Sequence, residues 1–277
     1  MAEFDDSLPA QLAAVREMIF DGQFEEAWII LNRLETMYPE SADILALMGD
    51  AAMRAGDPEH AWEIYGEALD LDPTWSDLWS ARARCCIELC DMKAAKADCQ
   101  QAIFLDGRNA EAHYAAAVIA EFDGRYIEAD VNYRTAAQLD SENFPMPFRE
   151  ESDELFEEMV AGAFKQISLE CGSGFEDVIM RVDDLPTLEE FAETGLSPLA
   201  TSYLDLPPEQ EGVFTTVEPP PTIVIFKRNV ERMSRVTEDL RREVEFAIVN
   251  ELINLYEEFG EPIPKCLEDR ADEELVH

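Results

Sequence analysis

Basic residues are scarce in this chain of 277 residues. Its 21 lysines and arginines stand against 61 aspartates and glutamates, which gives a formal net charge of −40. Such a charge repels phosphate backbones and anionic lipid surfaces, so we expect neither nucleic acid nor a membrane as a partner. The acids are spread over both halves of the chain. A basic partner would suit them, although a well-solvated surface accounts for them without any partner.

Histidine, cysteine and long apolar runs are also scarce. The three histidines, His60, His113 and His277, share no motif, and the six cysteines are not spaced as a secreted disulfide framework. Four cysteines cluster between residues 85 and 99, where core filling competes with a thiolate metal site. No run approaches the roughly 20 apolar residues of a membrane span, and the first residues lack signal-peptide features. We therefore expect a cytoplasmic protein without a metal or other cofactor.

A 34-residue period runs from Leu8 to Asn143 and divides this part of the chain into the units 8–41, 42–75, 76–109 and 110–143. The fifteenth position holds Gly, Gly, Cys and Gly, where a helix must stop and turn. The twentieth position is alanine in every unit, which allows two helices to approach closely. The twenty-fourth position carries core-filling side chains, namely Leu31, Tyr65, Cys99 and Tyr133.

This spacing resembles the tetratricopeptide repeat and covers all of residues 8–143. The resemblance implies an α-solenoid of four helix-turn-helix repeats, with a concave groove that binds a protein or peptide. The lysines and asparagines with which some such repeats grip a terminal carboxylate are missing here. Arginines in the groove could clamp a carboxylate instead, or they could pair with the neighbouring acids Asp50, Glu88 or Asp21. The candidate partner-binding residues are Arg16, Asp50, Arg54, Arg84 and Tyr114.

The second half follows a proline-marked junction at 144–151 and predicts a small α+β domain over residues 152–262. We expect helices over 152–167 and 188–193, strands over 178–182 and 222–226, and a long surface loop over 197–221. A helix should begin at Thr237 and end near Gly260, because apolar residues recur there every three to four positions. Residues 263–277 read as an acidic C-terminal tail.

The order of these elements resembles a family of small bacterial zincin-like metallopeptidases. That family carries His-Glu-x-x-His-x-x-Gly-x-x-Asp on its active helix, where this chain has Asn250-Glu251-Leu252-Ile253-Asn254 and Gly260 at the third-ligand position. Neutral amides are poor zinc ligands, so the resemblance implies that zinc is lost and that Glu251 is a vestigial general base. The fold class we predict is an α-solenoid of four repeats followed by a small, degenerate zincin-like domain.

Basic residues are concentrated in one short segment near this predicted cleft. The segment could contact an acidic partner, or it could dock on the acidic repeats of the same chain. It consists of Lys227, Arg228, Arg232, Arg235, Arg241 and Arg242.

Together these features favour a non-catalytic adaptor for protein–protein interaction. In this interpretation the repeat groove recruits a protein, and the zincin-like pseudoenzyme domain binds or regulates a peptide without cutting it. The alternative is an active metallopeptidase with unorthodox metal ligands, in which Glu251 is the general base. The sequence leaves the choice between enzyme and adaptor open, with the missing histidines favouring the adaptor.

Overall fold

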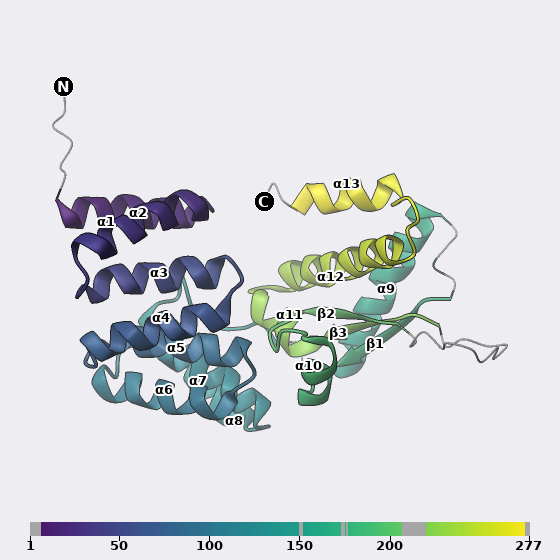
Figure 1. Cartoon of the computed structure of the whole chain (residues 1–277). Helices are drawn as coiled ribbons and strands as arrows, with labels where there is room; N and C mark the ends of the chain where they lie inside the picture. Colours follow the sequence, from purple (N-terminus) through teal and green to yellow (C-terminus); the bar gives the residue numbers. More distant parts are fainter. Residues whose placement is uncertain (1–6, 150–151, 173–174, 176, 207–219, 275–277) are drawn as a thin grey trace. The chain divides into compact units, whose positions relative to one another are not determined.

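The computed structural model describes residues 7–149, 152–172, 175, 177–206 and 220–274 (Figure 1). The chain divides into two compact units, Met1–Pro145 and Met146–His277. Residues 150–151 of the predicted junction, 207–219 of the predicted loop and 275–277 of the predicted tail lie outside the described residues.

The first unit is an array of helix pairs, as the 34-residue period predicts. Each predicted unit contains two helices joined by a tight turn, and each pair packs on the next (Figure 1). The α-solenoid is thereby confirmed. Its helices are α1 (Leu8–Phe20), α2 (Phe24–Met37), α3 (Ala42–Arg54), α4 (Pro58–Leu71), α5 (Ser76–Glu88), α6 (Met92–Leu105), α7 (Ala110–Phe122) and α8 (Tyr126–Leu139).

The repeating small and large positions form the core of this array. The alanine at the twentieth position is buried in every repeat, and so is the side chain at the twenty-fourth. A small side chain beside a large one lets the two helices of a pair interlock at close range. Gly49 shows how tight this packing is, because a Cβ atom added there would lie 2.5 Å from the ring of Tyr65.

The turn between the two helices requires a left-handed backbone at the fifteenth position. Gly22, Gly56 and Gly124 adopt φ values of 75°, 82° and 69°, and Cys90 adopts 59° in the third repeat. A side chain with a Cβ atom costs about 1–2 kcal/mol in this conformation, whereas glycine adopts it freely. The third repeat therefore tolerates a strained turn that the other three avoid.

Replacing Cys90 by glycine should stabilise the array by about 1 kcal/mol, because it removes the steric cost at this turn. The free energy of unfolding, measured by urea titration of the full chain, checks this expectation. Cys90→Ala is the matched control and should bring no gain, because it keeps the Cβ atom. Equal stabilisation by both variants would show that the thiol, and not the backbone, carries the strain.

The second unit is an α+β domain built on a three-stranded sheet. The strands are β1 (Ile179–Asp183), β2 (Ser202–Asp205) and β3 (Thr222–Phe226), in the spatial order β1-β3-β2. β1 runs parallel to β3, whereas β2 pairs with it in the antiparallel direction. The helices are α9 (Asp153–Cys171), α10 (Leu188–Thr194), α11 (Lys227–Met233), α12 (Thr237–Glu258) and α13 (Lys265–Glu274).

One core joins the sheet to the helices of this unit. Ile223 and Ile225 of β3 are fully buried and share a cluster with Phe156 of α9 and with Val244 and Ile248 of α12. The alternation along β3 places these two isoleucines on the helix-covered face. The predicted α+β class is confirmed, because the strands at 179–183 and 222–226 and the long α12 fall where the sequence patterns indicate.

Two elements of the second unit differ from the sequence expectations. β2 lies inside the segment 197–221, which the prolines assigned to a loop. α13 lies inside the predicted acidic tail, where Leu267 is fully buried in the core. Cys266 of α13 forms a disulfide with Cys171, across 95 residues of sequence. Both corrections share a cause, because long-range pairing stabilises segments whose local composition favours loops.

Candidate functional site

The carboxylate of Glu251 is the centre of the candidate site in the second unit. Glu251 lies on α12, and only 8% of its surface is exposed. Ser202 of β2 donates a hydrogen bond from its hydroxyl to Oε1 at 2.7 Å. Asn254 donates from its amide nitrogen to Oε2 at 2.9 Å. Both carboxylate oxygens are thus hydrogen-bonded, and the site ties the strand β2 directly to the helix α12.

The packing of α12 and β2 explains how these groups meet. Val244, Ile248 and Leu252 are fully buried and fix the rotation of α12 against the core. β2 packs on α12 as well as on β3, so the short strand carries Ser202 to the flank of the helix. The sequence indicated Glu251 and Asn254 but missed Ser202, because this serine is 49 residues from Glu251 and falls in a proline-rich segment.

The other residues predicted from the zincin motif lie along the same helix or just beyond it. Asn250 is half-buried, and Asn254 is exposed. α12 ends at Glu258, with Phe259 as its C-cap, so Gly260 lies beyond the helix and adopts a φ of 64°. The structure therefore brings Asn254 to Glu251, and it places Gly260 in the turn that ends the helix.

These residues do not fit a zinc ion. Zinc in proteins takes imidazole, thiolate or carboxylate ligands, usually three or four of them. Here two amides occupy the ligand positions, and the one carboxylate already accepts two hydrogen bonds. Within the described ranges of the chain, no group of three or more His, Cys, Asp and Glu residues is arranged to hold a metal ion. No hydrolytic step can be derived from this donor set.

The strand β2 has an edge that no strand of the described sheet covers, because the strand order places it last. The backbone N–H of Phe226 donates to the carbonyl of Thr201 at 2.9 Å. This bond shows which residues of β2 direct their backbone groups toward β3 and which direct them away from it. By that alternation, Thr201, Tyr203 and Asp205 bond to β3, and the backbone groups of Ser202 and Leu204 face away from it. An extended peptide could pair with those outward groups.

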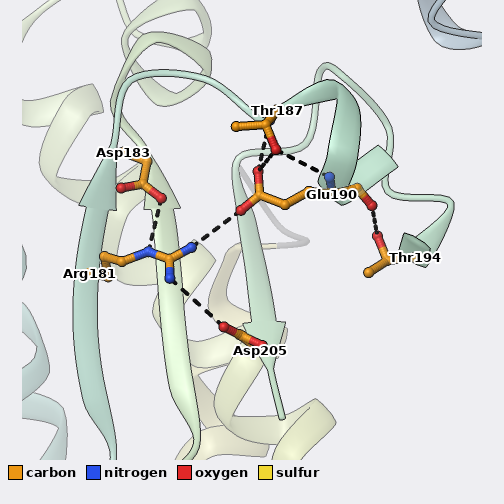
Figure 2. Close-up of polar contacts among 6 residues, drawn as sticks. All are labelled: Arg181, Asp183, Thr187, Glu190, Thr194 and Asp205. Carbon is orange, nitrogen blue, oxygen red and sulfur yellow. Dashed lines mark hydrogen bonds and ion pairs between the residues drawn. The ribbon is translucent and has the colours of Figure 1, made fainter. Parts of the chain in front are cut away.

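A polar network around Arg181 links β1 and β2, the two outer strands of the sheet (Figure 2). The guanidinium of Arg181 on β1 contacts Asp183 at 2.9 Å, Glu190 of α10 at 3.2 Å and Asp205 of β2 at 3.8 Å. Glu190 also completes a capping box with Thr187 at the start of α10. The network is partly exposed, so each ion pair contributes little energy. Its effect is to orient α10 and the end of β2 relative to β1.

The basic segment of the second unit does not form one positive surface. Lys227 and Arg232 are buried, and Lys227 contacts Asp153 at 2.5 Å and Glu231 at 3.9 Å. Arg149 also contacts Glu231, at 3.0 Å. Arg235, Arg241 and Arg242 are exposed, and Arg228 is half-buried. The periodicity of α11 turns two of the six cations inward, where acids of the same unit neutralise Lys227.

In the repeat array, the predicted partner-binding residue Arg84 forms an ion pair with an acid of the same array. Arg84 of α5 contacts Glu111 of α7 at 3.0 Å, and the hydroxyl of Ser80 donates to Glu111 at 3.1 Å. Burial raises the pKa of Glu111, and the neighbouring Arg84 opposes that shift. Asp50 accepts a hydrogen bond of 2.6 Å from the hydroxyl of Tyr65. Arg84 therefore pairs with an acid inside the array, although its partner Glu111 is not among the acids that the sequence suggested.

The remaining groove candidates have different environments. Arg16 is exposed on α1. Arg54 is exposed on α3, with its guanidinium 5.8 Å from the centre of the Phe20 ring. The ring of Tyr114 packs edge-on against Tyr133 at 5.1 Å, so it is part of an aromatic cluster as well as a groove candidate.

Three of the four clustered cysteines of the third repeat are packing residues. Burial raises the pKa of Cys85 to about 12, of Cys86 to about 11 and of Cys99 to about 12. A thiol with such a pKa stays protonated at neutral pH and is a poor nucleophile. These three side chains therefore act as small core residues.

The fold defines a helical-repeat protein joined to a small α+β domain, and two family models identify the parts. Residues 42–85 match the tetratricopeptide repeat, and residues 175–259 match the zincin-like metallopeptidase family. The second match contains Glu251 and ends one residue before Gly260. The chain thus combines tetratricopeptide repeats with a zincin-like domain.

No helix in the described part of the chain is long and apolar enough to cross a membrane.

Similar proteins match the repeat half. Stress-induced-phosphoprotein 1 of Caenorhabditis elegans is 29% identical over 143 residues, 52% of this chain and 42% of that protein, so the match spans less than half of that relative. Tetratricopeptide repeat protein 36 of Mus musculus is 28% identical over 142 residues, 50% of this chain and 71% of that protein. Among solved structures, a thermophilic tetratricopeptide-repeat protein of Thermus thermophilus is 19% identical with a TM-score of 0.46, covering 51% of this chain and 78% of its own.

Proposed function

We propose that this protein is a non-catalytic, cytoplasmic adaptor that binds proteins or peptides through both of its units. Tetratricopeptide repeats support a role in protein interaction, because their stacked helices present an extended groove. The acidic surface of the chain favours a basic partner, and such binding should weaken as salt screens the charges. The zincin-like domain would bind a peptide without cutting it.

The hydrogen bonds of Glu251 carry this proposal. A general base in a zincin must be free to take a proton from a metal-activated water. Here the carboxylate accepts hydrogen bonds from Ser202 and Asn254, and amides stand where the metal ligands would be. Without a bound metal ion, water keeps a pKa far above neutrality, and Glu251 has no activated nucleophile to generate. The arrangement supports a polar contact between β2 and α12 in place of a catalytic centre.

The open edge of β2 suggests how a peptide would bind. β-augmentation requires only unpaired backbone groups and a surface for alternate side chains, and no metal. Ser202 and Leu204 direct their backbone groups away from β3, next to the helix that carries Glu251. A peptide in extended form would therefore lie along β2.

Zinc content provides the first test. The purified, tag-free protein dialysed against zinc should contain far less than one zinc ion per chain by mass spectrometry. The double variant Asn250→His/Asn254→His should bind more zinc than the natural protein under the same conditions, because two imidazoles one helical turn apart can reach one zinc ion. One zinc per chain in the natural protein would favour the alternative function, a metallopeptidase with unorthodox ligands.

The variant Glu251→Gln separates the two functions further. An adaptor should keep its partner binding, since glutamine can still accept one of the two hydrogen bonds. We expect a stability loss of about 1 kcal/mol from the weakened contact. A metallopeptidase would instead lose its activity, because the general base is gone. Cleavage of a peptide by the natural protein, abolished by this substitution, would contradict the adaptor proposal.

A further inference from the structure

The disulfide between Cys171 and Cys266 attaches the last helix to the rest of the second unit. Cys171 ends α9, Cys266 is the second residue of α13, and their Cα atoms are 5.6 Å apart. α13 packs on α12 and on α9. In Figure 1, α13 (yellow) lies alongside α12. The disulfide is therefore a covalent link between the helices α9 and α13 of this unit.

The other described contacts of α13 are one buried leucine, a partly buried alanine at position 271 and two ion pairs of one arginine. Leu267 is fully buried, and it is the residue that follows Cys266. Arg270, one turn after Cys266, contacts Glu245 of α12 at 3.3 Å and also pairs with Glu170 of α9. Both acids are more than a third exposed, so water and salt screen these pairs. A helix of ten residues is marginal in water without tertiary support.

The two cysteines of the disulfide are less buried than three of the free cysteines. Cys171 and Cys266 are both half-buried, whereas Cys85, Cys86 and Cys99 are buried free thiols in the other unit. Structural disulfides are rare in reducing compartments, where those that form are usually transient and redox-sensing. A half-buried pair that attaches a short helix to the core has the properties of such a sensor.

We propose that Cys171 and Cys266 form a thiol-controlled clamp that keeps α13 docked when oxidised and releases it when reduced. The reductant is a small dithiol. One of its thiolates attacks a sulfur of the pair, breaks the S–S bond and forms a mixed disulfide. Its second thiol then closes an intramolecular disulfide, which leaves two protein thiols and transfers two electrons to the protein. Release of α13 would uncover the surface of α9 and α12 that Leu267 covers in the docked state. This proposal does not depend on the adaptor function.

Amide hydrogen exchange of the full-length protein, with and without dithiothreitol, tests the clamp. Reduction should speed exchange of the α13 amides by about tenfold or more, because local opening becomes easier. Amides of α12 between Leu240 and Leu252 should change much less, since they belong to the main core. The double variant Cys171→Ser/Cys266→Ser is the control, and its α13 should exchange rapidly whether or not dithiothreitol is present.

Thiol counting by alkylation under denaturing conditions gives a second readout. The oxidised protein should show four alkylated cysteines, and the reduced protein should show six. Six free thiols after exposure to a mild oxidant would overturn the clamp, because the pair would not form. Unchanged α13 exchange upon reduction would overturn it as well, even for a protein in which the pair does form. Neither readout requires the serine variant to fold.

Discussion

Replacing Asp98 by alanine should destabilise the repeat array by about 3 kcal/mol or more, within the range of about 3–5 kcal/mol for breaking a buried ion pair. Arg82 of α5 and Asp98 of α6 form two parallel hydrogen bonds of 2.7 Å. Only 8% of the Asp98 side chain and 20% of the Arg82 side chain is exposed. The guanidinium also lies 4.7 Å from the ring centre of Trp79. Loss of the carboxylate leaves a partly buried cation without its bidentate partner.

The double variant Arg82→Met/Asp98→Leu is the informative control. Apolar residues of similar volume often replace a buried ion pair without loss, so this variant should recover most of the stability. All four tryptophans, at positions 28, 62, 75 and 79, lie in the first unit, so their fluorescence during urea unfolding reports on the repeats alone. A loss of under about 1 kcal/mol for Asp98→Ala would show that water screens the pair as it does at an exposed site.

The repeat array could be predicted from the sequence because its contacts are local. Each helix packs on the neighbours that precede and follow it, so the same small set of positions recurs every 34 residues. The alanines at the twentieth position mark where helices approach, and the residues at the fifteenth position mark the turns. What the period does not encode is the pairing of individual charges. Arg84 and Glu111 lie in different repeats, and only the fold shows that they neutralise each other.

The second unit could be predicted less completely, for the opposite reason. Apolar periodicity located α12 and β3, but β2 is only four residues long and depends on pairing with β3. Ser202 is invisible as a site residue until that pairing places it beside Glu251. Likewise, the acidic composition of the segment that forms α13 suggests a tail. In the structure, a disulfide connects this segment to Cys171, 95 residues earlier in the sequence. Local composition carries no information about such contacts.

The basic segment shows the same limit in its charges. Six cations within 16 positions suggest a binding surface, but a helix distributes neighbouring residues over all of its faces. Lys227 therefore points toward Glu231 and Asp153, and Arg149 reaches Glu231 from outside the segment. Glu231 is 1% exposed, and the neighbouring cations compensate its charge. The cluster acts as an internal brace at the point where β3 passes into α11.

Removing that buried acid should have a large effect on the second unit. We expect Glu231→Ala to destabilise it by about 3 kcal/mol, because Arg149 would lose its 3.0 Å ion pair and Lys227 would keep only one of its two acids, Asp153. Far-UV circular dichroism should show earlier melting, while tryptophan fluorescence, which reports on the first unit, should keep its midpoint.

An exposed ion pair of the same unit supplies the comparison for Glu231→Ala. Arg242, whose side chain is 52% exposed, contacts Asp239 at 3.4 Å, and Arg242→Gln should cost less than about 1 kcal/mol. A similarly small loss for Glu231→Ala would mean that water reaches the site of Glu231 and that the cluster is not a brace. Lys227 would then again be a candidate for contact with an acidic partner, beside the exposed cations of the segment. A large loss confined to the second unit would instead assign Lys227 to the fold and leave the exposed Arg235, Arg241 and Arg242 as the basic residues of this segment that a partner can contact.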